Sequence, residues 1–370
     1  MNIRFILVAS LACSGCQALF HVESVGPAAD GAPGTDAAGD SIDSPNLAFV
    51  TSMKIAPGSL GSVDAADAMC SSLAAAANHP GHYVAWLSSS TSRATSRIGA
   101  AARGWVRPDG RPFADTLVDI AQGRIWYPLR VTETGQDVAT TGVAGDVVVA
   151  TGTEADGAAS IYTCDDYTNA SSSRAVGAGL ADNAPYGWTS LMGAICSEPA
   201  RLYCFGIDHI APVTLTPEST RHAFVTVNDL TSGGGVAAYD QDCATEAMGA
   251  ALTGTYRAAI ATTSQSAMSR FTPGAPWVRA DGVTAIDSSG ALLAPVLFGP
   301  SGGFDVTVAW SGAPSLTQVA PDSASSCGDW TVSASTTLGL TGNITRSGHD
   351  AFGGIPNPCN NGLRVYCLQD

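Results

Sequence analysis

Positive charge is scarce in this sequence. Lys54 is the only lysine among 17 basic residues, and 32 acidic residues give the chain a formal net charge of −15. A surface of this charge repels phosphate backbones and anionic lipid headgroups. We therefore expect no nucleic-acid partner.

Long apolar runs are also missing, because no stretch approaches the roughly 18 unbroken apolar residues that a membrane-spanning helix needs. The apolar run at 5–12 is only eight residues long, and it follows Arg4. A basic residue, a short apolar run and then small residues form the pattern of an export signal.

The residues after this run resemble the bacterial lipobox, in which a cysteine is diacylated and becomes the new N-terminus. Ser14 and Gly15 precede Cys16, while Cys13 occupies the position where leucine is usual. We predict a signal peptide over 1–15 and a lipid on Cys16, which places the protein in the bacterial envelope, at the outer membrane or the cell surface. Lipidation at Cys13 and an ordinary secretory signal without a lipid are the alternatives.

Eight of the ten cysteines remain once Cys13 is removed and Cys16 carries the lipid. An even number of cysteines in an exported chain is typical of a disulfide framework. A zinc site needs Cys or His ligands about two to four residues apart, whereas the cysteine pairs here have the spacing C-x7-C and the six histidines are scattered. We expect disulfides and neither a metal nor another cofactor.

Regular structure is expected to begin at the apolar stretch LAFVTS (47–52). The preceding segment, 16–46, is rich in Ala, Gly, Pro and Asp and has no lysine or arginine. Such a composition buries too little apolar surface to offset the entropy lost on ordering. We predict a disordered acidic tether there.

The rest of the chain contains two copies of one pattern. Three short segments recur: AFVT (48–51 and 223–226), WVRPDG and WVRADG (105–110 and 277–282), and CDDYT and CGDWT (164–168 and 327–331). The cysteines form two sets, with 32 residues from the second to the third and eight from the third to the fourth in each: Cys70, Cys164, Cys196, Cys204 and Cys243, Cys327, Cys359, Cys367. We predict tandem domains at 47–208 and 222–370, joined by a linker at 209–221.

Each copy is expected to have one clear helix, several strands and long loops. Asp64 is a plausible N-cap for the first helix, which should stop before Pro80. Strands are expected at 82–88, 201–207, 255–261 and 363–369. The two copies differ in length mainly at 110–163 and its counterpart 283–326. Loops accept such changes and present ligand contacts, so these segments are where we expect any ligand to bind.

The order of these features resembles endostatin, the collagen-derived domain with a C-type lectin-like fold, and a family of bacterial surface lipoproteins that carry such a domain. The stretches that carry the resemblance are GSVDAADAMC (61–70), YVAWLSSS (83–90), YTCDDYT (162–168) and CSEPARLYC (196–204). The resemblance implies an α+β protein with two tandem C-type lectin-like domains. Each domain would have a small mixed or antiparallel sheet, one or two helices and long loops stapled by disulfides.

The resemblance also implies a nested disulfide pairing, first cysteine with fourth and second with third. Carried over, it gives Cys70–Cys204, Cys164–Cys196, Cys243–Cys367 and Cys327–Cys359. From the residues alone, four cysteines allow three connectivities and none is selected. The calcium and sugar motifs of many C-type lectins are absent, as are the zinc histidines and the basic heparin face of endostatin. Neither calcium-dependent sugar binding nor heparin binding is therefore inherited.

Catalytic motifs are not evident. There is no G-x-S-x-G, and the histidines outside the signal region fall at the ends of elements or at turns. Asp165, Asp166 and Asp329 are possible calcium ligands or a general-acid pair, but Asp166 and Asp329 align between the copies, which favours a shared structural task. We predict that the protein is not an enzyme.

Three tryptophans are candidates for ligand contacts. Trp126, Trp188 and Trp310 have no partner at the same offset in the other copy, whereas Trp105 and Trp277 match and are expected in the cores. We predict a lipid-anchored, non-catalytic binding or adhesion protein whose ligand is an extracellular glycan or protein. The alternatives are a structural envelope component without a specific ligand and an exported hydrolase.

Overall fold

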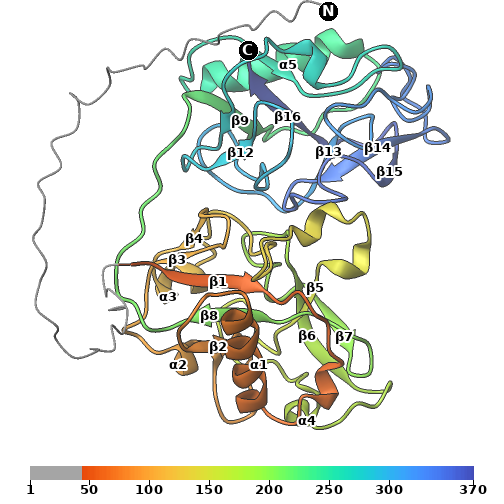
Figure 1. Ribbon diagram of the computed structural model, residues 1–370. Coiled ribbons are helices and arrows are strands. Elements are labelled where there is room, and N and C mark those ends of the chain that lie inside the picture. The colour runs from red at the N-terminus through yellow and green to blue at the C-terminus, as the bar shows by residue number, and fades with distance from the viewer. Residues whose placement is uncertain (1–43) are drawn as a thin grey trace, which may run out of the picture. The chain divides into compact units, whose positions relative to one another are not determined.

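The computed structural model describes residues 44–370 (Figure 1). The expected signal peptide, Cys16 and almost all of the expected tether lie outside these residues. The described residues belong to one compact unit. Within them, no helix is long and apolar enough to cross a membrane.

The first copy is built around a five-stranded sheet with the strand order β2-β8-β1-β3-β4. The central strand β1 runs antiparallel to β8 and parallel to β3. A second, three-stranded sheet has the order β5-β6-β7. The strands of the two sheets are β1 (Asn46–Val50), β2 (Tyr83–Ala85), β3 (Trp105–Val106), β4 (Pro112–Ala114), β5 (Val148–Ala150), β6 (Ala175–Leu180), β7 (Met192–Ile195) and β8 (Tyr203–Gly206).

The helices of the first copy are short, apart from one. The long helix, α1 (Val63–Ala76), lies against β2 (Figure 1). The remaining helical segments are α2 (Ala94–Ile98), α3 (Leu117–Ala121) and α4 (Cys164–Tyr167), with 3-10 turns η1 (Pro57–Ser59), η2 (Val138–Thr140) and η3 (Ala144–Asp146).

The second copy repeats this arrangement with all its strands in one sheet. The order β10-β16-β9-β11-β12 matches β2-β8-β1-β3-β4 of the first copy, and β13, β14 and β15 extend the sheet beyond β16. The elements are β9 (Arg221–Val225), α5 (Gly235–Gly249), β10 (Tyr256–Ala258), η4 (Met268–Arg270), β11 (Trp277–Val278), β12 (Thr284–Ile286), β13 (Val308–Trp310), β14 (Leu338–Asn343), β15 (Ile355–Pro358) and β16 (Arg364–Gln369). The described chain is thus α+β, with mostly strands and few helices.

The N-cap of helix α1 lies two residues before the predicted one. Ser62 is its N-cap and accepts a hydrogen bond from the Ala65 backbone N–H at 3.1 Å, so the prediction of Asp64 as the cap was wrong. Asp64 lies in the first turn instead, where a carboxylate is favoured by the helix dipole. Serine and aspartate are about equally favourable as N-cap residues, so the sequence did not show whether Ser62 or Asp64 caps the helix.

An arginine–aspartate pair ties each long helix to the neighbouring strand. Asp67 of α1 accepts from the Ala85 backbone N–H at 2.8 Å and from Arg97 at 2.6 Å. In the second copy, Asp240 takes the same place with Ala258 and Arg270. Because the arrangement recurs, the contact is part of the repeated framework.

Four disulfides join the cysteines in the nested pairing that the resemblance implied. Cys70–Cys204 and Cys243–Cys367 link each long helix to the last strand of its copy, with Cα atoms 5.5 Å apart. Cys164–Cys196 and Cys327–Cys359 each close a loop with a sequence separation of 32. The predicted pairing is confirmed, and such a disulfide set is typical of exported proteins.

A left-handed turn occurs at the second cysteine of each copy. Residues 164–167 all have positive φ, between 52° and 68°, and residues 327–330 repeat the turn with φ between 48° and 69°. Left-handed backbone costs non-glycine residues about 1–2 kcal/mol each, so it persists only where surrounding contacts fix it. Here the disulfide fixes one end, and buried rings, Tyr167 and Trp330, fix the other.

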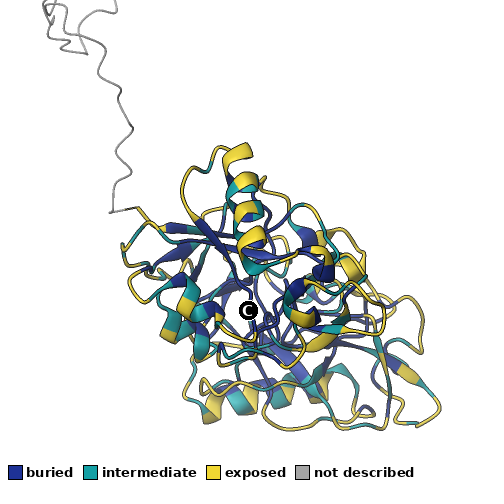
Figure 2. Cartoon of the chain, turned by 90° about the horizontal axis from the view of Figure 1, so that it is seen from below, coloured by how far each residue is buried: buried dark blue, intermediate teal, exposed yellow. Residues whose placement is uncertain are grey.

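Each copy has apolar clusters packed against its main sheet, and the central strands are buried while many loops are exposed (Figure 2). Trp105 and Trp277 are fully enclosed, and each donates its indole N–H to a backbone carbonyl of the last strand. The expectation that these two are core residues is confirmed. Leu297 of the second copy packs in a cluster of the first, so the cores are continuous across the junction.

We predict that replacing Cys164 and Cys196 together by serine lowers the free energy of unfolding by about 3–4 kcal/mol, because a loop of this size is no longer closed in the unfolded chain. Denaturant unfolding of the oxidised protein measures the loss. The matched double replacement of Cys327 and Cys359 should cost a similar amount. An unchanged midpoint in both variants would contradict the structural role of these bridges.

Candidate functional site

Two short segments pair where the copies meet. Asn183 and Arg346 form an antiparallel bridge. On either side of it, the Ala184 backbone N–H donates to the Thr345 carbonyl and the Ser347 backbone N–H donates to the Asp182 carbonyl, both at 2.9 Å. The junction of the copies therefore has sheet-like hydrogen bonds of its own.

A buried ion pair lies on this junction. The Asp182 side chain is completely enclosed, that of Arg346 is 9% exposed, and Nη2 of Arg346 lies 3.0 Å from Oδ2 of Asp182. Nε of Arg346 donates to the same carboxylate at 3.1 Å, and Nη1 donates to Asp350. A buried carboxylate is tolerated only with such a partner, so each copy depends on the other at this point.

Arg130 crosses the junction from the first copy. Its guanidinium donates to the Leu292 carbonyl and to the Ser347 hydroxyl, both at 3.0 Å, and it pairs with Asp137 at 2.8 Å. Burial lowers the pKa of Arg130, and the nearby Asp137 carboxylate opposes that effect. The side chain thus fixes a loop of the second copy against η2 of the first.

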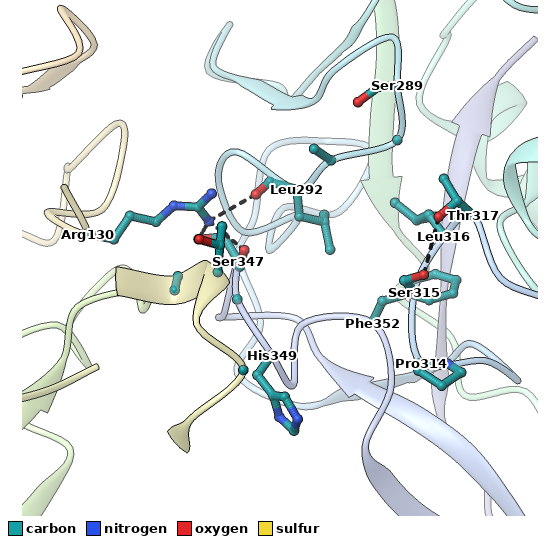
Figure 3. Close-up of a pocket in the computed structure, with 16 residues that line it drawn as sticks. Arg130, Ser289, Leu292, Pro314, Ser315, Leu316, Thr317, Ser347, His349 and Phe352 are labelled. Atoms are coloured by element: carbon teal, nitrogen blue, oxygen red, sulfur yellow. Dashed lines mark hydrogen bonds between the residues drawn. The ribbon is translucent and has the colours of Figure 1, made fainter. Parts of the chain in front are cut away.

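A cavity of about 490 Å³ opens beside Arg130, with walls from both copies. Figure 3 shows Arg130 and Ser347 on one side of it and Ser315, Leu316 and Thr317 on the other. Five hydroxyl side chains line this hydroxyl cavity: Thr140, Ser289, Ser315, Thr317 and Ser347. No Asp or Glu is among its lining residues, which sets it apart from the strongly acidic chain as a whole.

A second cavity of about 280 Å³ also has walls from both copies and shares no lining residue with the first. We call it the aromatic cavity, because Trp126, Phe298 and Phe304 line it together with Ile125, Pro185 and Leu297. Arg279 and Asp281 supply its polar wall and pair with each other at 2.7 Å.

The structure separates the three tryptophans predicted to contact a ligand. Trp126 lines the aromatic cavity. Trp188 packs against Trp86 in the first core, and Trp310 is enclosed in the second core, where it donates to the Leu230 carbonyl at 2.9 Å. A ligand cannot reach Trp188 or Trp310 without displacing packed side chains, so their interpretation as ligand contacts is corrected.

Trp188 has no tryptophan counterpart because the two cores are packed differently. The Tyr203 hydroxyl donates to the backbone carbonyl of Trp188, and in the second copy the Tyr366 hydroxyl makes the same contact with the carbonyl of Ala351. An alanine thus takes the place of Trp188 in the second core.

The aspartates beside the second cysteines hold the left-handed turns. Asp166 accepts from the Ser90 backbone N–H and hydroxyl, and Asp329 accepts from the same groups of Thr263. The Ser90 hydroxyl holds the pKa of Asp166 below its usual value. Their shared task is thus structural, and among residues 44–370 no group of three or more His, Cys, Asp or Glu side chains is placed to hold a metal ion.

Two histidines have carboxylate partners. His82 pairs with Asp208 at 2.9 Å, and His349, at the edge of the hydroxyl cavity, pairs with Asp350 at 2.7 Å. In the described part of the chain, no serine hydroxyl donates to either imidazole. These pairs therefore lack the adjacent nucleophile that hydroxyl–imidazole–carboxylate catalysis needs.

The sequence located the cavities only coarsely. Trp126 and Arg130 come from 110–163, and Ser289 and Ser315 come from 283–326, the segments that differ in length between the copies. Ser347 was missed, because nothing local marks a serine that faces another copy. No protein-family model and no curated protein sequence matches this chain.

We predict that Arg346→Met lowers the free energy of unfolding by about 3–5 kcal/mol, since the buried Asp182 carboxylate then loses the arginine that donates hydrogen bonds to it. Chemical denaturation measures the change. The double variant Asp182→Leu/Arg346→Met should be more stable than the single one. If Arg346→Met unfolds at the wild-type midpoint, the junction does not depend on this pair.

We also predict a pH dependence from Asp166, whose pKa is lowered on folding. Its contribution to stability is present above the unfolded pKa of about 4 and is lost as the pH falls through the folded value. Asp166→Asn should therefore be less stable than wild type at neutral pH, and the difference should shrink at about pH 2. Thermal unfolding across this range measures it, and a difference that stays constant would contradict the assignment.

Proposed function

We propose that this protein is a lipid-anchored component of the bacterial cell envelope that binds an extracellular glycan, with one saccharide unit in the hydroxyl cavity. The observation that carries the proposal is the composition of that cavity. It combines five hydroxyl side chains with apolar surface and has no carboxylate among its lining residues. The protein's task in this proposal is non-catalytic binding.

The chemistry of the cavity suits a saccharide. Serine and threonine hydroxyls both donate and accept hydrogen bonds, as the hydroxyls of a sugar ring do. Leu292, which is half-buried, and Pro314, which is exposed, add apolar surface that can face the C–H side of the ring. The volume of about 490 Å³ falls in the range of sites for small molecules, about 300–1,000 Å³.

The framework around the cavity supports binding without a large rearrangement. Arg130 links the η2 loop to Leu292 and Ser347, and the Asp182–Arg346 pair closes the junction behind them. Preformed walls reduce the entropy lost when a ligand binds. Four disulfides and the expected export signal are typical of a protein that works outside the cytoplasm.

A structural envelope component remains the second candidate, because the same buried junction gives a stiff spacer. The two candidates differ in one respect only, since a spacer needs no ligand in the hydroxyl cavity. The hydrolase alternative gains nothing from the two histidine–aspartate pairs described above.

The test is a glycan array probed with the mature protein, followed by calorimetry on the glycans that bind. Thr317→Val removes one cavity hydroxyl at nearly constant volume and should weaken binding roughly three- to tenfold, the share of one hydrogen bond. Ser315→Phe should fill the cavity and abolish binding without unfolding the protein, because position 315 is only half-buried.

Thr336→Val is the matched control, because Thr336 is exposed and lies outside both cavities. It should bind as wild type. Absence of any bound glycan would favour the spacer, and wild-type affinity of Thr317→Val and Ser315→Phe for a bound glycan would place that glycan elsewhere.

A further inference from the structure

The aromatic cavity has features that the proposed glycan site does not use. Its lining residues are distinct from those of the hydroxyl cavity, and they include three aromatic rings and no Ser or Thr. A glycan in the hydroxyl cavity would leave this second cavity empty. Its occupant must therefore be inferred from its own walls.

The charged groups in these walls are already paired. Arg279 is almost fully enclosed and donates to Asp281 and, at 3.0 Å, to the Pro295 carbonyl, while its guanidinium lies 5.1 Å from the centroid of the Phe298 ring. Arg124 donates to Asp119 at 2.9 Å. Because both arginines have carboxylate partners, a charged ligand would gain little here, and an uncharged one fits better.

The aromatic rings leave apolar surface uncovered. Phe304 is 48% exposed, although it makes edge contacts with Phe298 and Tyr186 at centroid distances of 6.5 and 6.2 Å. Trp126 is the only one of the seven tryptophans that is not enclosed in a core. Aromatic rings favour edge and offset contacts with a further ring, so this arrangement selects an aromatic ligand over an aliphatic one.

The size of the cavity limits the ligand. At about 280 Å³ it lies at the lower end of the range of small-molecule sites, about 300–1,000 Å³. One ring or two fused rings fit that space, whereas an oligosaccharide does not. The walls come from Ile125 and Trp126 of the first copy and from Leu297, Phe298 and Phe304 of the second, so the site exists only while the junction is intact.

We propose that the aromatic cavity binds a free, uncharged aromatic molecule of phenol or indole size, held between Trp126 and the rings of Phe298 and Phe304. This site is independent of the proposed glycan site. Loss of one function therefore leaves the other measurable.

The experiment uses Trp126 as the reporter in the mature protein. Acrylamide quenches the fluorescence of tryptophan side chains that solvent can reach. Trp126 is only partly buried, whereas the other six tryptophans are enclosed. Tryptophan fluorescence is excited at a wavelength that phenols do not absorb. Under these conditions, added p-cresol should shield Trp126 from quenching by acrylamide, and Trp126→Phe should remove the effect. Cyclohexanol, of similar size without the aromatic ring, should bind at least about tenfold more weakly than p-cresol.

Phe304→Ala should weaken p-cresol binding roughly tenfold. Val306→Ala, at a 68% exposed position two residues further along and outside the cavity, should leave it unchanged. Thr317→Val should also leave it unchanged, which separates this site from the glycan site.

Four results would overturn the proposal. They are no shielding by millimolar p-cresol, equal binding of cyclohexanol, wild-type affinity in Phe304→Ala, and much tighter binding of a tyrosine-containing extended peptide than of p-cresol. The last result would assign the cavity to a side chain of a protein partner.

Discussion

The buried pair of Asp182 and Arg346 is the contact on which the rest of the structure depends. Each copy has its own sheet, long helix and two disulfides, and these hold the copy together internally. Only the junction joins the copies into one unit, and there a carboxylate with no solvent exposure meets an arginine from the other copy. Both cavities have walls from each side of that contact, so their shape follows from it.

The hydroxyl cavity and the aromatic cavity both lie between the copies of a duplicated framework. The repeated contacts, such as Asp67 with Arg97 and Asp240 with Arg270, serve the framework in both. The unequal segments, 110–163 and 283–326, supply many of the residues that line the cavities. The framework is thus common to the copies, while the surfaces that suit ligands arise where the copies differ.

Much of the framework could be predicted from the sequence, because it repeats. Matching cysteine spacing and the recurring WVR segments indicated two equivalent units, and the disulfide pairing followed from the resemblance to endostatin-like domains. The sequence indicated a shared structural task for Asp166 and Asp329, but it did not predict the left-handed turns in which they lie. Local features with several chemically equal solutions were less predictable, as the cap of α1 at Ser62 shows.

The candidate site was largely beyond prediction, because it depends on contacts between distant residues. Asp182 and Arg346 are separated by 164 positions, and neither lies in a recognisable motif. Trp188, Trp310 and Trp126 all lack a matching tryptophan in the other copy. The first two fill cores, and only Trp126 lines a cavity, a difference that depends on tertiary contacts.

Native-state hydrogen exchange at the junction tests this account most directly. The backbone amides of Ala184 and Ser347 donate across the junction, to Thr345 and Asp182. If the copies form one unit through the buried pair, these two amides exchange as slowly as those of the core strands β8 and β16. Exchange at the rate of exposed loop amides would mean that the junction opens freely, and it would contradict the central claim that both cavities are preformed.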